Sequence, residues 1–204
     1  MLPGHIDHAY SQVISGLNQT DPEVRIAGET IHLTVEAKDL YGNLRSNGSD
    51  KDALTVNAVY VNHSAYISPI GVGDLERWED IWGKNITGEL IEKPDHPGQY
   101  EAFISIFRAG MYAFHVRVFG EDILGFPKNF DIAPNPSIYA PKSIISGLNT
   151  SEPLVAGNPL TFQIQARDYY SNNLATLASA LSSKNVTLTT NGAQIEGTIT
   201  DKLN

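Results

Sequence analysis

Apolar and polar residues alternate in two stretches of the chain that lie far apart. In residues 31–37 and again in residues 160–166, an apolar side chain occupies every second position. An alternation with a period of two predicts a β-strand with one face on a hydrophobic core and the other in water. Each stretch runs into a short segment rich in Asp and Asn, which accept backbone hydrogen bonds in turns. The pattern therefore predicts the same strand and turn in two copies.

Further strands are predicted in the first copy. They fall at residues 53–61, 98–107, 110–120 and 128–134. The alternation is clearest at Tyr112, Phe114 and Val116. Several short strands separated by turns rich in Gly, Pro and Asn predict an antiparallel β-sandwich, so the expected fold class is all-β.

The repetition extends beyond the strand and the turn. The sequence VISGLN at residues 13–18 recurs as IISGLN at residues 144–149, and the Ala-Gly pair at Ala27 recurs at Ala156. A period of about 130 residues predicts tandem domains rather than a solenoid. We expect an N-terminal segment at 1–9, a first repeat at 10–133, a Pro-bearing linker at 134–143 and a second repeat at 144–204. The second repeat has about half the length of the first, so we expect a truncated sandwich.

Several motifs of the first copy occur in a fixed order. They are an Ala-Gly start at Ala27 and Gly28, the Asp39 to Asn43 turn, then Asp95, Gly98 and Tyr100, then Ala109, Gly110 and Tyr112, and finally Gly120, Ile123, Gly125, Pro127 and Phe130. Together they resemble the filamin-type immunoglobulin-like repeat, in full over about residues 10–133 and in part over 140–204. The second copy departs from the pattern at Ser171, which stands where the first has Gly42, so we expect a looser turn there.

The resemblance implies tandem immunoglobulin-like sandwiches of filamin type. In that family a partner peptide docks by adding a strand to a sheet edge beside the third and fourth strands. By resemblance these strands are residues 53–61 and 88–93. An insertion at about residues 62–88 enters between them, so it either covers the groove or extends it, and no groove residues are carried over.

The insertion holds both tryptophans of the chain. Residues 74–83 predict a short helix, with Asp74 at its N-cap and Gly83 as its stop. Leu75, Trp78 and Trp82 share one face of this helix. One interpretation is a flap that packs on the sandwich. The other is an interface for a protein partner, because Trp is enriched at interaction hot spots.

Composition excludes several classes of function. The net charge of −9 argues against a nucleic-acid partner, which requires clustered Lys and Arg. The absence of cysteine excludes disulfides and thiolate sites. No apolar run is long enough for membrane insertion. No catalytic motif is recognisable, so we expect neither an enzyme nor a cofactor.

Candidate metal ligands are weak. His5 and His8 lack a third ligand, and the acidic residues of the predicted helix are better explained as its solvated face. Asp39 and Asp168 recur between the copies, and we interpret them as turn residues rather than catalytic carboxylates. The sequence therefore predicts no metal site.

Sequons for N-glycosylation are frequent. Six Asn-x-Ser/Thr sequences occur, whereas a random order of the same residues would give about two. Their acceptors are Asn18, Asn47, Asn62, Asn85, Asn149 and Asn185. This excess favours an extracellular or cell-surface glycoprotein, although turns rich in Asn and Ser also generate sequons by chance.

Two functional hypotheses remain. The first is a cell-surface adhesion module, part of a larger extracellular or membrane-anchored protein, that binds itself or another surface protein. The second is a cytoplasmic, actin-crosslinking or scaffold protein of the filamin kind that docks partner peptides on a sheet edge. A glycan- or polymer-binding module attached to an enzyme is a third possibility. The sequons favour the first.

Overall fold

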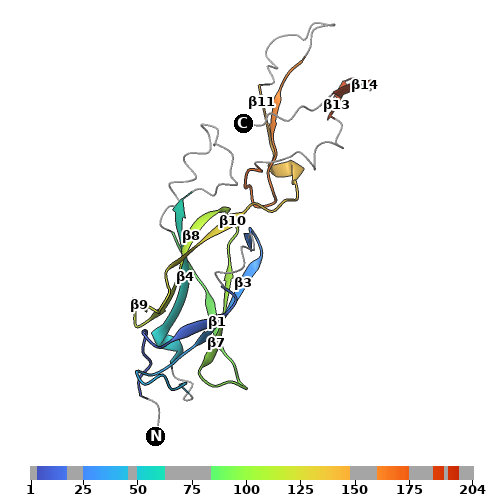
Figure 1. The fold of residues 1–204 in the computed structure, drawn as a ribbon. Helices are drawn as coiled ribbons and strands as arrows, with labels where there is room; N and C mark the ends of the chain where they lie inside the picture. The colour runs from blue at the N-terminus through green and yellow to red at the C-terminus, as the bar shows by residue number, and fades with distance from the viewer. Residues whose placement is uncertain are drawn as a thin grey trace. The chain divides into compact units, whose positions relative to one another are not determined.

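The chain forms two units, Met1–Ala133 and Pro134–Asn204 (Figure 1). The structure is a computed structural model that describes residues 4–17, 25–45, 50–62, 84–147, 160–174, 186–190 and 193–197. The helix predicted at 74–83 lies outside these residues, and the described part of the chain contains no α-helix. The described elements of both units are β-strands and short 3₁₀ turns.

The first unit is a sandwich of two sheets. One sheet has the order β1 (Gln12–Ser15), β3 (Thr30–Glu36), β7 (Gln99–Ser105), β6 (Glu89–Glu92). The other has the order β2 (Arg25–Ile26), β10 (Lys128–Ala133), β8 (Gly110–Val118), β4 (Leu54–Asn62), β5 (Asn85–Thr87), with β9 (Glu121–Asp122) paired to β8. The central strands of this second sheet are β4, β8 and β10, which are the third, sixth and seventh main strands of the sandwich. A four-stranded sheet that faces a sheet built on these three strands is the immunoglobulin arrangement. The strand order confirms the predicted immunoglobulin-like β-sandwich.

Alternation along the strands builds the core. Burial alternates along the whole of β8, and the strands that flank it place every second side chain on the same inner face. The fully buried large side chains include Tyr100, Tyr112, Phe114, Leu33, Ile104, Val56 and Val116. Phe114 and Phe130 pack edge to face with ring centroids 5.3 Å apart. The period-two pattern of the sequence is therefore the pattern of the core.

Tyr112 stabilises the connection that leads from β7 in one sheet to β8 in the other. It lies near the start of β8, is 2% exposed, and donates a hydrogen bond of 3.0 Å from its hydroxyl to the carbonyl of Arg108. Burial raises the pKa of Tyr112, so the hydroxyl keeps its proton and donates. A tyrosine that bonds back to the chain just before the sixth strand is a hallmark of immunoglobulin sandwiches.

The second unit repeats part of this plan. In it, β11 (Ile144–Ser146) pairs antiparallel with β12 (Gln163–Gln165), and β13 (Val186–Thr190) pairs with β14 (Ala193–Gly197). The 3₁₀ turn η3 (Ala140–Lys142) precedes β11. The pair β11–β12 corresponds to β1–β3 of the first unit, as the sequence repeat requires.

Replacement of Tyr112 by Phe should lower the free energy of unfolding of the first unit by about 1 kcal/mol, because the ring stays buried while the hydrogen bond to Arg108 is lost. Hydrogen exchange along β8, followed by mass spectrometry, measures the change in this unit alone. The matched control is Tyr41→Phe, since Tyr41 is 72% exposed. Equal effects of the two replacements would contradict a role of the hydroxyl in closing the corner.

Candidate interaction edge

Residues 84–92 run from one sheet of the first unit to the other. Strand β5 pairs antiparallel with β4, with Ala58 opposite Ile86. The next strand, β6, pairs antiparallel with β7 in the other sheet. This crossing closes the side of the sandwich on which the sequence places the third and fourth strands of the repeat.

Gly88 is the residue at which the chain changes sheets. Its N–H still donates to the carbonyl of Val56 on β4, at 2.7 Å. A Cβ at this position would lie 2.6 Å from Cγ1 of Ile104 and 3.2 Å from the carbonyl oxygen of Phe103. The crossing therefore passes so close to β7 that it leaves no room for a side chain.

The strand predicted at 88–93 is confirmed as β6, whereas β5 is a finding of the structure. Residues 85–87 fall within the expected insertion, and a three-residue strand is too short for an alternation to be recognised. The consequence concerns docking. Over residues 57–59, the edge of β4 that a partner peptide would extend is already paired with the chain's own β5.

The outer edge of β5 carries backbone groups that no described strand pairs with. The backbone N–H and C=O groups of Lys84, Ile86 and Gly88 point toward β4. The N–H of Tyr60 donates to the carbonyl of Lys84 at 3.4 Å, and the N–H of Gly88 donates to the carbonyl of Val56. Between these two bonds, Ile86 pairs with Ala58. In an antiparallel ladder the residues between such pairs turn their N–H and C=O groups the other way. Asn85 and Thr87 therefore point these groups away from β4, and no described strand pairs with them.

Asn85 is held by its side-chain oxygen. Nδ2 of Asn57, a buried residue of β4, donates to Oδ1 of Asn85 at 2.5 Å. Asn85 itself is exposed, as is Thr87, two residues further on the same side of the strand. Among the described residues, Nδ2 of Asn85 makes no hydrogen bond, so the amide nitrogen of this sequon faces solvent with its oxygen fixed behind it.

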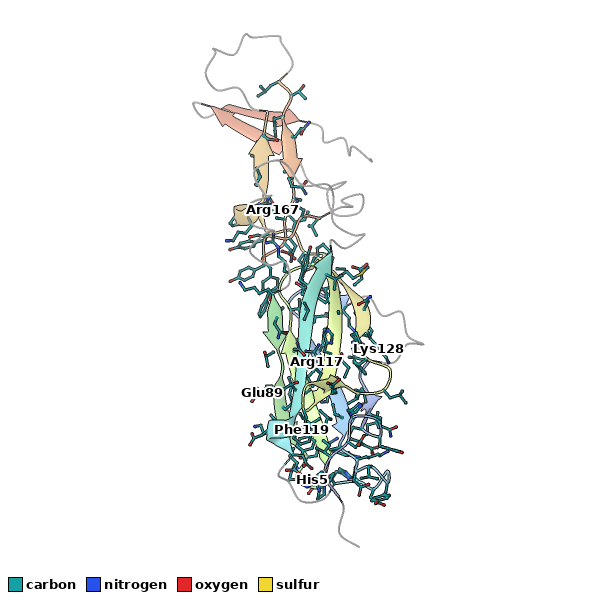
Figure 2. All side chains as sticks on the ribbon, turned by 90° about the vertical axis from the view of Figure 1, so that its left-hand side faces the viewer. His5, Glu89, Arg117, Phe119, Lys128 and Arg167 are labelled. Carbon is teal, nitrogen blue, oxygen red and sulfur yellow. The ribbon has the colours of Figure 1, made fainter. Side chains whose placement is uncertain are left out.

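A cluster of charged residues lies on the outer face of the same sheet. His115 Nδ1 is 3.0 Å from both carboxylate oxygens of Asp122 and 2.8 Å from Nη2 of Arg117. Arg117 is labelled in Figure 2. Arg117 Nε also pairs with Asp122 Oδ1 at 3.2 Å. The cluster ties β9 to β8. Among the described residues, no three His, Asp or Glu side chains are placed to hold a metal ion.

The other predicted candidates are only partly covered. Leu75, Trp78 and Trp82 lie outside the described residues, as do Asn18, Asn47, Asn149 and Asn185. Asn62 is the last residue of β4, and the rest of its sequon lies outside the described residues. Asn85 is thus the one sequon whose three residues are all described. The histidine His32 stacks on Phe103 with ring centroids 4.7 Å apart, on the outer face of the first sheet.

The Asp39 turn is stabilised by its own carboxylate. Oδ1 accepts hydrogen bonds from the N–H groups of Tyr41 and Asn43, both at 2.9 Å, and Oδ2 accepts from Asn43 Nδ2 at 3.1 Å. Oδ2 also accepts from the N–H of Gly4 at 2.9 Å, which fastens the N-terminal segment to the turn. The carbonyl of Gly4 in turn accepts a hydrogen bond from Nη1 of Arg45. Because both carboxylate oxygens of Asp39 accept hydrogen bonds that hold the turn and the N-terminal segment, Asp39 is a structural residue.

These contacts set the acidity of Asp39. Burial raises the pKa of the carboxyl, but the hydrogen bonds from Gly4, Asn43 and Tyr41 outweigh burial and lower the pKa from 3.8 to about 2. The carboxylate therefore stays ionised at any physiological pH, and it is not a proton donor or acceptor for chemistry.

Asp168 does the same work in the second unit. It accepts hydrogen bonds from the N–H groups of Tyr170 and Asn172 at 2.9 and 2.8 Å, and from Asn172 Nδ2 at 2.8 Å. Its Oδ2 also accepts from the N–H of Asn135 at 3.0 Å, in the place that Gly4 takes in the first unit. Segment 134–143 thus docks on the second turn as the N-terminal segment docks on the first.

Ser171 adopts the conformation of the glycine that it replaces. Its φ is 71°, close to the 79° of Gly42, and the second turn closes with the same set of hydrogen bonds as the first. The expected loosening of this turn is absent from its hydrogen bonds. The serine instead occupies a left-handed conformation that is unfavourable for a residue with a Cβ.

Comparison with known proteins yields structures of similar fold. No family model matches the chain, and no curated protein matches it. The Lin-41 filamin domain is 20% identical with a TM-score of 0.40, over 63% of this chain and 97% of that domain. The Escherichia coli adhesin FdeC is 16% identical with a TM-score of 0.45, over 96% of this chain and 56% of the adhesin chain.

Invasin, a bacterial integrin-binding protein, is 15% identical with a TM-score of 0.41, over 84% of this chain and 28% of its own. The chain therefore spans little more than half of the adhesin chain and less than a third of invasin. At these identities and TM-scores, the strand order rather than the likeness establishes the fold.

Replacement of Ser171 by Gly should stabilise the second unit by about 0.5–1 kcal/mol, because glycine adopts a positive φ without the strain caused by a Cβ. Gly42→Ser is the matched control and should destabilise the first unit by a similar amount, since a Cβ there meets no atom within 4 Å and only the backbone strain remains. Hydrogen exchange followed by mass spectrometry reports each unit separately. Changes of the same sign in both variants would refute this explanation.

The stability that Asp39 contributes should depend on pH. Because its pKa is lower in the folded than in the unfolded chain, the contribution is complete above about pH 4 and is lost as the pH falls through about 2. The free energies of unfolding of the wild type and of Asp39→Asn should therefore converge between pH 4 and pH 2. Urea unfolding at a series of pH values measures the difference. A difference that stays constant over this range would show that the carboxylate is not held as described.

Proposed function

We propose that the chain is a non-enzymatic tandem immunoglobulin-like module for adhesion at the cell surface or outside the cell. It would bind a second copy of itself or another surface protein, as part of a larger extracellular or membrane-anchored protein. The observation that carries the choice between the two leading hypotheses is the pairing of β5 with β4. A module that docks peptides beside its third strand needs that edge open, and here the chain's own β5 fills it over residues 57–59.

The alternative, a cytoplasmic scaffold of the filamin kind, meets a specific obstacle. A peptide added to β4 would first have to displace β5, which is followed directly by the crossing at Gly88. The crossing is packed against Ile104 of β7, so β5 cannot swing away without disturbing the sandwich. Docking on this edge therefore carries an energetic cost that an open edge does not have.

The sequons support an extracellular setting. Six occur where about two are expected by chance. At Asn85, the sequon that the structure describes in full, the side chain is exposed and its amide nitrogen is turned to solvent. An N-glycan requires this placement on the folded protein.

The partner surface remains a proposal on sequence grounds. Leu75, Trp78 and Trp82 combine an apolar face with two aromatic residues of the type enriched at hot spots. They belong to the expected insertion, which precedes β5 in the sequence.

The described part of the chain contains no helix long and apolar enough to cross a lipid bilayer.

When the chain is expressed in a secretory host, it should carry N-glycans that an N-glycosidase removes, with a loss of mass and conversion of the occupied Asn residues to Asp. Peptide mapping by mass spectrometry identifies which of the six sequons are used. The same chain produced in the cytosol is the control and should show no such loss. A secreted, folded chain without glycan at any sequon would contradict the extracellular proposal.

A further inference from the structure

The open edges of the first unit are protected in different ways. Strand β1 is interrupted by a shift of register between Val13 and Ser15, and β2 is only two residues long. Strand β6 carries Glu89 and Glu92, and charged side chains on an edge oppose pairing with another strand (Figure 2, where Glu89 is labelled). Each of these features is a known means of preventing edge-to-edge association.

Strand β5 has none of these features except that it is short. Its three residues, Asn85, Ile86 and Thr87, are uncharged, and no bulge interrupts its pairing with β4. Ile86 and Thr87 are β-branched, which favours extended structure. The N–H and C=O groups of Asn85 and Thr87 point outward in the arrangement that a further strand would require.

The sequon lies at this short, uncharged edge, with which no described strand pairs. Asn85 is both the glycan acceptor and one of the two residues that present outward backbone groups. Its Oδ1 is held by Asn57, which fixes the plane of the amide and leaves Nδ2 exposed next to the edge. A bulky, hydrated glycan on that nitrogen would occupy the space into which a pairing strand must enter.

We propose that an N-glycan on Asn85 is the protection of the β5 edge. It keeps a second copy of the chain from pairing with this strand, and so directs association to other surfaces. This inference rests on the proposed extracellular function, because only a secreted chain receives the glycan.

Position 87 provides a matched set of variants. Thr87→Ser keeps the sequon and therefore the glycan. Thr87→Ala removes the sequon but leaves Asn85 and its hydrogen bond to Asn57 in place. Thr87→Lys also removes the sequon and adds a charge at the edge, which should replace the glycan as protection. Thr87 is exposed, so none of the three changes disturbs the core.

The full chain is produced in a secretory host, glycan occupancy at Asn85 is measured by peptide mapping, and the molar mass is followed by light scattering over a series of concentrations. Wild type and Thr87→Ser should carry glycan at Asn85 and show the same molar mass at every concentration. The molar mass of Thr87→Ala should rise above that of the wild type as concentration increases, whereas the molar mass of Thr87→Lys should match that of the wild type.

The outcomes separate this inference from the proposed function. If the other sequons are occupied and Asn85 is not, the inference is overturned while the extracellular proposal stands. If Thr87→Ala and Thr87→Ser have the same molar mass at the highest concentration, the glycan does not protect the edge. If Thr87→Ala and Thr87→Lys associate equally, the association does not run through β5 and the inference is again overturned. If no sequon is occupied at all, both proposals fail.

Discussion

Unpaired backbone groups at the sheet edges are the constraint on which the rest of the first unit depends. A sandwich of two open sheets has four edges, and each edge presents N–H and C=O groups that can recruit another chain. The crossing at residues 84–92 is a single segment that pairs with one strand of each sheet. Its first part pairs with β4 and its second part with β7, so neither β4 nor β7 is an edge of its sheet along these residues.

The same segment decides how the unit can interact. By pairing with β4, the segment occupies the position where strand addition is expected. The edge of this sheet is then the short strand β5 instead of β4. Gly88 makes this geometry possible because no side chain fits between the crossing and Ile104. The proposed preference for an adhesion module over a peptide-docking scaffold rests on three residues of local pairing rather than on the overall fold, which both share.

The turns at Asp39 and Asp168 are stabilised in the same way. In each unit the carboxylate accepts hydrogen bonds from N–H groups of its own turn and from one N–H group of the segment that precedes the first strand. The Pro-bearing segment 134–143 is therefore engaged with the second unit through Asn135, not only a spacer between repeats. A carboxylate held in this way is structural, as expected for the repeated turn residues Asp39 and Asp168.

Sequence alone determined the features that depend on local pattern: the alternating strands, the turn at Asp39 and its copy at Asp168, the tandem repetition and the fold class. These are encoded by residues close together in the chain, so period and turn chemistry reveal them. Only the tertiary structure decided which edge is open, because β5 is too short to show a period and its pairing with β4 joins residues 28 positions apart, as in Asn57 and Asn85. The orientation of the Asn85 amide likewise depends on a neighbour, Asn57, that folding brings to it. A sequon can be read from three letters, but whether it protects an edge depends on where the backbone groups of its strand point, and that is set by the strand beside it.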